Sequence, residues 1–241
     1  MVHRILLHTF RFLGLSAFLM VCPRGIGGVL LQAAQESSVK PGINERWKSD
    51  NIEPLIETLE SINRDIYTNR KKLAELVKPV EGSTVADIGA GSGFMAEEFA
   101  RMVGEKGIVY AVDINLKLLE RIEDHALRRN LRNIRTRLAT DDSSRLPPNF
   151  IDLVFICDTY HHFEYPKSTM QTVFEALKPG GEIVLVEFKR IPGESAQWIM
   201  DHVRAGKEQF TQEILDAGFH FVREHDAPFL PRNYVLRFRK P

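Results

Sequence analysis

The chain has 241 residues, 44% of them hydrophobic and 27% charged, which is enough to build the core of one α/β domain. Lysine plus arginine and aspartate plus glutamate each number 32, so the formal net charge is zero and no nucleic-acid partner is expected. The two cysteines, Cys22 and Cys157, form no disulfide framework and show no metal-ligand spacing, so no metal site is expected.

The first 35 residues differ in composition from the rest of the chain. They contain no acidic residue, and an apolar run from Phe12 to Cys22 follows several basic residues and precedes Ala33 and Ala34. This order is typical of a secretory signal peptide or an uncleaved membrane anchor. A transit peptide and a later translation start are the alternatives. We therefore expect residues 1–35 to export the protein or attach it to a membrane, with a cytoplasmic location as the alternative.

Residues 36–80 are predicted to form a polar linker and then a helical lid. Asn51 can cap a helix in which apolar residues recur every three or four positions from Ile52 to Ile62. The helical pattern continues from Ile66 to Val77, and Pro79 ends it.

Strands and helices alternate over the remaining residues, 81–241. The predicted strands cover residues 84–88, 108–113, 134–139, 151–157, 182–187, 219–223 and 234–239. The predicted helices cover residues 94–103, 116–129 and 166–177, with another that ends near Gly218. The run from Ile151 to Cys157 is almost continuously apolar, as in a parallel strand buried on both faces. The pattern predicts an α/β fold with a Rossmann-like, doubly wound, mostly parallel seven-stranded sheet behind the N-terminal lid.

A glycine-rich loop follows the first predicted strand, from Asp87 to Phe94 (DIGAGSGF). Glycines let the backbone approach a ligand closely, and the helix that follows offers free N–H groups to a carboxylate or phosphate. The G-x-G-x-G spacing, with Phe94 after it, differs from the G-x-G-x-x-G pattern of dinucleotide-binding proteins. Asp113 ends the second strand, where a carboxylate can accept hydrogen bonds from ribose hydroxyls.

Together these features resemble class I S-adenosylmethionine-dependent methyltransferases, and most closely the small-molecule branch of the ubiquinone and menaquinone biosynthesis type. The likeness rests on Asp87 to Gly93, on Asp113, on the segment that starts at Asp158 and on the turn from Leu177 to Gly181 (LKPGG). It spans residues 83–218. The combination is more specific than any one of these motifs alone.

The resemblance implies a site for S-adenosylmethionine. The glycine-rich loop would hold the methionine moiety, with Asp87 orienting the loop or binding the amino group. Asp113 would bind the ribose, and Asp142 or its neighbour Asp141 would meet the adenine amino group. Asp158 and the residue after it would lie near the methyl group. The residues expected to bind the cofactor are Asp87, Gly89, Ala90, Gly91, Ser92, Gly93, Asp113, Ile114, Asp141, Asp142, Asp158 and Thr159.

The segment from Asp158 to Phe163 follows the fourth strand, where ligands bind in doubly wound sheets. Methyl transfer from a sulfonium needs an aligned nucleophile and exclusion of water, and a base helps when the nucleophile holds its proton. His161 is the preferred candidate base because histidine titrates near neutrality, and His162 is the second candidate. Tyr160 either lines the pocket or packs in the core. The candidate substrate-contacting residues, of which the first three are spaced to share a helix face, are Glu60, Arg64, Tyr67 and Glu187.

The sequence thus predicts an enzyme that transfers a methyl group from S-adenosylmethionine to a small-molecule acceptor. The alternatives are a methyltransferase acting on protein or lipid, a non-catalytic homologue that binds the cofactor, and, least favoured, an NAD-dependent oxidoreductase. Phe94 and the LKPGG turn argue against the oxidoreductase. Because S-adenosylmethionine is made in the cytosol, the expected cofactor argues against export.

Overall fold

A seven-stranded sheet organises residues 36–241, the part of the chain that the computed structural model describes. The strand order is β3-β2-β1-β4-β5-β7-β6, with β7 antiparallel to β5 and to β6 and all other pairs parallel. The strands are β1 (Thr84–Ile88), β2 (Ile108–Asp113), β3 (Ile134–Leu138), β4 (Ile151–Cys157), β5 (Leu177–Phe188), β6 (His220–His225) and β7 (Asn233–Arg239). The predicted doubly wound, mostly parallel sheet is confirmed. The predicted signal peptide or anchor lies outside the described residues.

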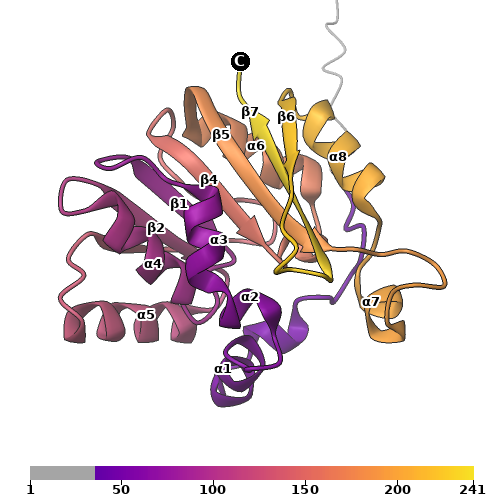
Figure 1. Ribbon diagram of the computed structural model, residues 1–241, viewed down its shortest axis with the longest axis horizontal. Helices are drawn as coiled ribbons and strands as arrows, with labels where there is room; N and C mark the ends of the chain where they lie inside the picture. The colour runs from indigo at the N-terminus through magenta and orange to yellow at the C-terminus, as the bar shows by residue number, and fades with distance from the viewer. Residues whose placement is uncertain (1–35) are drawn as a thin grey trace, which may run out of the picture. The chain divides into compact units, whose positions relative to one another are not determined.

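Helices cover both faces of the sheet (Figure 1). They are η1 (Glu45–Lys48), α1 (Glu53–Leu59), α2 (Asp65–Thr68), α3 (Arg70–Val77), α4 (Phe94–Val103), α5 (Leu116–Arg128), η2 (Tyr160–His162), α6 (Pro166–Ala176), α7 (Gln197–His202) and α8 (Lys207–Asp216). Adjacent residues of β4, Val154 and Phe155, belong to two different buried clusters, because side chains alternate across a strand. Within residues 36–241, no helix combines the length and apolar character needed to cross a bilayer.

The order in which strands are added to the sheet reverses between β1 and β4. These two strands are neighbours in space although β2 and β3 separate them in the chain. The loops that follow the carboxyl ends of these two strands therefore meet, which is where open α/β sheets bind ligands. A Cβ on Gly89, after β1, would lie 2.2 Å from the side chain of Thr159, after β4. Figure 1 shows α1 and α2 at this end of the sheet.

The helical lid differs from the prediction. The helix expected to start from an Asn51 cap and reach Ile62 has Ile52 as its N-cap, without a side-chain cap, and ends at Leu59. Ile62 is 81% exposed, so the apolar spacing that suggested a longer helix includes a residue that is not packed. At the end of α1, the Arg64 guanidinium donates to the Leu59 carbonyl at 3.2 Å.

Two differences concern β5 and the segment after it. The LKPGG sequence, predicted as a turn, begins β5 at Leu177, and the register shifts before Glu182 pairs with Leu153. Gly180 adopts a left-handed φ of 78° within this irregularity. The short helix α7 was not predicted, and His202 is its last residue.

Candidate active site

A cavity lies where the carboxyl ends of β1, β2 and β4 meet the glycine-rich loop. Trp47 and Leu59, from the lid segment, also line it. Most of the residues predicted to bind the cofactor line this cavity, which we call the loop cavity. They are Asp87, Gly89, Ala90, Gly91, Asp113, Ile114, Asp141, Asp158 and Thr159.

Three residues of the predicted cofactor set have other roles. Ser92 uses its carbonyl to accept a hydrogen bond from Arg121 at 2.8 Å. A Cβ on Gly93 would lie 2.6 Å from Ile122, so this glycine lets α4 begin close to α5. Asp142 accepts a hydrogen bond from a threonine hydroxyl in its own turn, at 2.8 Å. These three residues do not line the loop cavity, and their direct contact with the cofactor stays a prediction. Asp141 is the member of the acidic pair that faces the cavity.

Asp113 fixes the glycine-rich loop to the end of β2. Its Oδ2 accepts the Gly91 N–H at 2.8 Å, and its Oδ1 accepts the Asn115 N–H at 2.9 Å. The carboxyl is buried, and burial raises its pKa. It thus orders the loop while still lining the cavity, where a ribose would meet it.

Asp87 has unused hydrogen-bonding capacity in the same cavity. It is 3% exposed, and its Oδ2 has no hydrogen-bond partner among residues 36–241. Burial, assisted by the nearby Asp113 charge, raises the pKa of Asp87 to about 7. A buried acceptor without a donor indicates a missing ligand group. An ammonium such as that of S-adenosylmethionine would supply the donor, so the residues present fit the expected cofactor.

A second cavity of about 1050 Å³, the lid cavity, adjoins the first. The residues that line both cavities are Trp47, Leu59, Arg64, Asp158 and His162. Trp47, Phe188 and Trp198 give the lid cavity aromatic walls. Arg46 and Arg232 add positive charge to them. A molecule here would lie beside whatever occupies the loop cavity.

An ion pair stands at the junction of the two cavities. Arg64 Nη2 donates to Asp158 Oδ2 at 2.9 Å, and Asn233 Nδ2 donates to Asp158 Oδ1 at 2.7 Å. Asp158 has a left-handed φ of 48°, which directs the chain away from β4. Of the lid residues predicted to contact substrate, Arg64 is thus placed at both cavities.

The other two lid residues are not. Glu60 and Tyr67 line a separate cavity, where Glu60 accepts a hydrogen bond from Arg121 at 3.1 Å. Tyr67 packs edge-on against Phe94, with ring centroids 5.4 Å apart. The prediction that they share a substrate-facing surface with Arg64 is wrong, because the helix that would align the three ends at Leu59.

His161 is held by a buried carboxylate. Its Nδ1 lies 2.7 Å from Glu187 Oε2, and its backbone N–H donates to the same oxygen at 2.9 Å. Because a carboxylate only accepts, Nδ1 carries the hydrogen of this bond, which leaves Nε2 as the ring nitrogen available to another partner. Glu187 has 0% exposure, so its predicted role as a substrate contact is corrected to that of the partner of His161.

Two more histidines lie against His161. The ring centroid of His162 is 4.3 Å away and that of His202 is 5.0 Å away. Burial is the main cause that lowers the pKa of His162 to about 2, and positive charge on its neighbours, including Lys40, acts in the same direction. Burial, with the charge of His161, lowers the pKa of His202 to about 4. Both rings are therefore neutral at physiological pH.

Tyr160 belongs to the core. It is fully buried, and its ring packs against those of Phe163 and Phe210, with centroids 5.1 Å away in each case. Its candidacy as a catalytic residue is corrected, because the first residue of η2 points into the protein while the next two face the lid cavity.

Sequence reasoning missed several residues of the site. Trp47, Leu59 and Trp198 carry no recognisable motif, and Asn233 lies at the start of the last strand. His202 is 40 residues from His162, so no local spacing could pair them. Only the folding of α7 against η2 brings these two rings together.

Comparison with known proteins adds to this geometry. Residues 86–185 match a family model described as a methyltransferase domain. The chain is 26% identical over 173 residues to the ubiquinone/menaquinone biosynthesis C-methyltransferase of Neisseria gonorrhoeae, covering 61% of this chain and 70% of the relative.

Solved structures share the fold. A SAM-dependent methyltransferase from Aquifex aeolicus superposes with a TM-score of 0.68 at 22% identity, covering 77% of this chain and 97% of that one. The cyclase SpnF superposes with a TM-score of 0.62 at 17% identity, covering 73% and 82%. Because one of these proteins is named as a cyclase, the fold alone does not specify the reaction.

Proposed function

Because this chain is a class I S-adenosylmethionine-dependent methyltransferase, we propose that it methylates a small molecule bound in the lid cavity. The observation that carries this proposal is the shared wall of the two cavities, at Asp158 and His162. S-Adenosylmethionine, bound along the loop cavity, supplies an electrophilic methyl group. The protein has to hold the acceptor in line with that group and exclude water.

The residues around the cofactor have distinct tasks in this proposal. Asp87 accepts from the amino group, and Asp113 accepts from the ribose while it holds the loop. Asp141, which also binds Lys48 at 3.0 Å, links the adenine end of the cavity to η1. Trp47 and Leu59 separate the cofactor from solvent on the lid side.

The acceptor cavity comes mainly from segments outside the methyltransferase-domain match. Of the residues that line it, Asp158, His161 and His162 lie within residues 86–185, and the rest come from residues 40–64 and 188–232. These segments therefore select the acceptor. Aromatic walls favour a flat acceptor, and the name of the Neisseria gonorrhoeae relative refers to quinone biosynthesis, which involves such molecules.

The first test is calorimetric titration of the full chain with S-adenosylmethionine, S-adenosylhomocysteine and NAD. We expect saturable binding of the first two ligands and a loss of at least about tenfold in affinity in Asp113→Ala, since a charge-assisted hydrogen bond is worth about 1.5–3 kcal/mol. Asp124→Ala is the matched control, because Asp124 is an exposed acid on α5. Binding of NAD without S-adenosylmethionine would overturn the cofactor assignment.

The second test measures the transfer of a labelled methyl group from S-adenosylmethionine to a panel of aromatic hydroxyl and thiol compounds. Trp198→Ala should lower transfer while leaving cofactor affinity unchanged, because Trp198 lines only the lid cavity. Phe221→Ala removes an equally exposed aromatic ring from β6 and should have no effect. Equal transfer by all three proteins, or label found in protein or lipid instead, would contradict a small acceptor in this cavity.

A further inference from the structure

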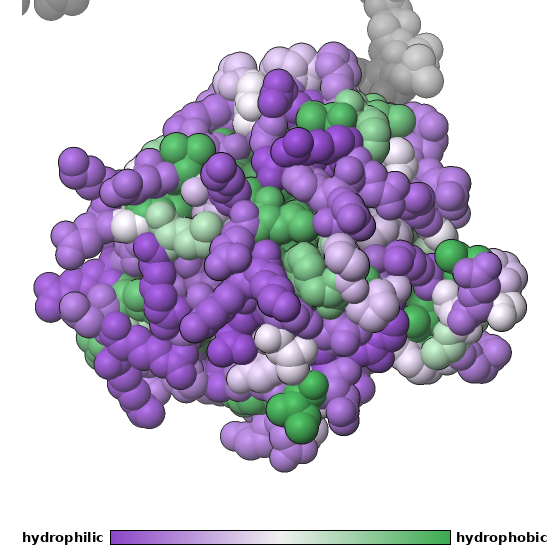
Figure 2. Space-filling view, in the orientation of Figure 1, coloured by the Kyte–Doolittle hydropathy of each residue, from purple (hydrophilic) through white to green (hydrophobic). Residues whose placement is uncertain are grey.

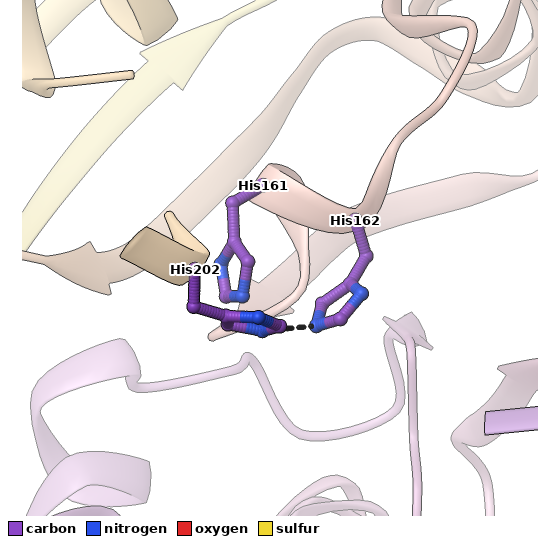
Figure 3. A group of neighbouring side chains, drawn as sticks. All are labelled: His161, His162 and His202. Carbon is purple, nitrogen blue, oxygen red and sulfur yellow. Dashed lines mark hydrogen bonds between the residues drawn. The ribbon is translucent and has the colours of Figure 1, made fainter. Parts of the chain in front are cut away.

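Three imidazole rings converge on one side of the lid cavity (Figure 3). His161 and His162 come from η2, and His202 is the last residue of α7. One nitrogen of each ring lies within 4.8 Å of one nitrogen of each other ring. We propose that these three histidines bind a divalent transition metal of the zinc class, and that its open coordination position faces the acceptor.

The spacing suits such a metal. Zinc binds histidine nitrogen at about 2.0–2.1 Å in tetrahedral geometry, which places two ligand nitrogens about 3.3 Å apart. Nε2 of His162 and Nε2 of His202 are already 3.3 Å apart. A metal between them would replace the single hydrogen that these two nitrogens now share. One nitrogen of the third ring lies within 4.8 Å of a nitrogen of each of the other two, so completing the set requires a movement of at most about 1.5 Å.

Glu187 supplies the support that a ligand histidine needs. Metal-bound histidines almost always donate their other N–H to a carboxylate, a carbonyl or water, which fixes the ring and its tautomer. His161 has this arrangement, with Nδ1 on Glu187 Oε2 at 2.7 Å and Nε2 free. Glu187 is itself fixed, because the Phe188 N–H donates to its other oxygen at 3.0 Å.

The end of α7 is also held in place. Lys40 Nζ donates to the backbone carbonyls of Asp201 at 3.1 Å and of His202 at 2.5 Å. These contacts fix the backbone from which the His202 ring extends. The Lys40 ammonium is hydrogen-bonded to these carbonyl oxygens. The Glu187 carboxylate, beside His161, offsets the positive charge of this ammonium near the metal ligands.

A role as general base would account for His161 alone and not for the convergence of three histidine rings. The pair of His161 and Glu187 is sufficient for proton transfer, and His162 and His202 add nothing to it. Three histidines with one side open to a cavity match the arrangement of catalytic zinc sites, which keep a fourth position for substrate or water.

This inference rests on the proposed function only for the identity of the fourth ligand. Because the site faces the lid cavity, that ligand is a hydroxyl or thiol of the acceptor. Imidazole ligands suit zinc, copper, iron and nickel, whereas magnesium and calcium prefer oxygen. The expectation of no metal, drawn from the sequence, rested on local spacing alone, which could not include His202.

The test is calorimetric titration of the chelator-treated full chain with zinc chloride, with magnesium chloride as the negative control. We expect one zinc ion per chain. His162→Ala and His202→Ala should abolish measurable binding, and Glu187→Gln should weaken it by about 10–100-fold, as for other residues that orient a metal ligand. His220→Ala, which removes an exposed histidine at the start of β6, should bind zinc as the wild type does. Cobalt(II) in place of zinc should give a tetrahedral absorption spectrum that changes when ethanethiol takes the open position.

Each variant is also titrated with S-adenosylhomocysteine, which reports an intact fold and cofactor site. Wild-type protein that binds this ligand but no zinc would overturn the metal site and leave the proposed function standing. Wild-type protein that binds zinc but no S-adenosylhomocysteine would do the reverse. Zinc binding that survives in both His162→Ala and His202→Ala would also overturn the assignment.

Discussion

Asp87 and Asp113 lie at the ends of adjacent strands, yet their carboxyl groups are used differently. Both oxygens of Asp113 accept backbone N–H groups, which offset part of the cost of burying its charge. Asp87 keeps one oxygen without a donor among the described residues. Sequence could identify both as acids at strand ends, but only the packing around each one determines which has a free oxygen for a ligand.

This difference predicts a pH dependence of cofactor binding. The pKa of Asp87 is raised by burial from an ordinary 3.8 to about 7, so the protonated form is the stable one in the free protein below that pH. A bound ammonium group stabilises the ionised form, and binding below pH 7 must therefore release a proton. We expect affinity for S-adenosylhomocysteine to rise as pH rises toward 7, by up to about tenfold per pH unit, and then to level off.

Titrations at pH 5, 6, 7 and 8, in two buffers of different ionisation enthalpy, check this prediction. Asp87→Asn cannot lose the proton and should bind weakly at all four pH values, with no proton release. The raised pKa of Asp87 also makes the free energy of unfolding depend on pH. Because the folded-state pKa is raised, the stabilisation from Asp87 is complete below pH 3.8 and is lost as pH rises through 7. A wild-type affinity that is flat between pH 5 and 7 would contradict the assigned role.

At the scale of elements, the start of α4 is governed by a contact with α5. Gly93 has a left-handed φ of 85°, and a Cβ there would lie 2.6 Å from Ile122 Cγ1. Gly180 has a similar φ of 78° but open space around it. Substitutions at these two glycines therefore distinguish the energetic cost of a left-handed backbone from the added cost of side-chain overlap.

We expect Gly180→Ala to lower the free energy of unfolding by about 1–2 kcal/mol, the cost of a left-handed alanine. Gly93→Ala should lower it by a further 1–3 kcal/mol or so, the usual cost of overpacking a core. Denaturant unfolding measures both values. The excess cost of Gly93→Ala should shrink when Ile122→Ala is also present, since that change removes the Cγ1 atom that the new Cβ would overlap. Equal costs for the two single variants would show that the α4–α5 contact is not tight.

The helices also show where the local sequence pattern is sufficient to predict the bounds of an element. The predicted bounds of α4 and α5 agree with the structure within one residue, and each helix buries one apolar face. The lid segment has similar spacing, but its first helix ends earlier than predicted. There, Arg64 donates to the carbonyl of the last residue of α1.

At the scale of the whole molecule, the face of residues 36–241 that Figure 2 shows is mostly hydrophilic. Figure 2 shows hydrophobic side chains on one face only in small, separated groups. The basic and apolar pattern of residues 1–35 contrasts with this surface. We therefore propose that the first 35 residues attach the enzyme to a membrane, which would favour an acceptor that partitions into lipid.

Cell fractionation of the full chain tests this attachment. The double substitution Leu15→Arg and Phe18→Arg should shift the protein from the membrane to the soluble fraction, because each charge costs about 2.5–3.5 kcal/mol at the centre of an apolar segment. Gln32→Arg and Gln35→Arg add the same charge outside the apolar run and should leave membrane association unchanged. Membrane association that persists after removal of residues 1–35 would refute the proposal.

The sequence by itself determined the sheet and the glycine-rich loop, because the apolar pattern of strands and the glycines of turns are set by local backbone chemistry. The cofactor came from the resemblance of the combined motifs to class I methyltransferases. Tertiary structure alone decided that Tyr160 is buried and that Glu60 and Tyr67 line a separate cavity. It also decided that His202 joins His161 and His162. The physical reason is that a site depends on which side chains converge in space, and convergence across distant segments is set by packing between elements, which no local pattern contains.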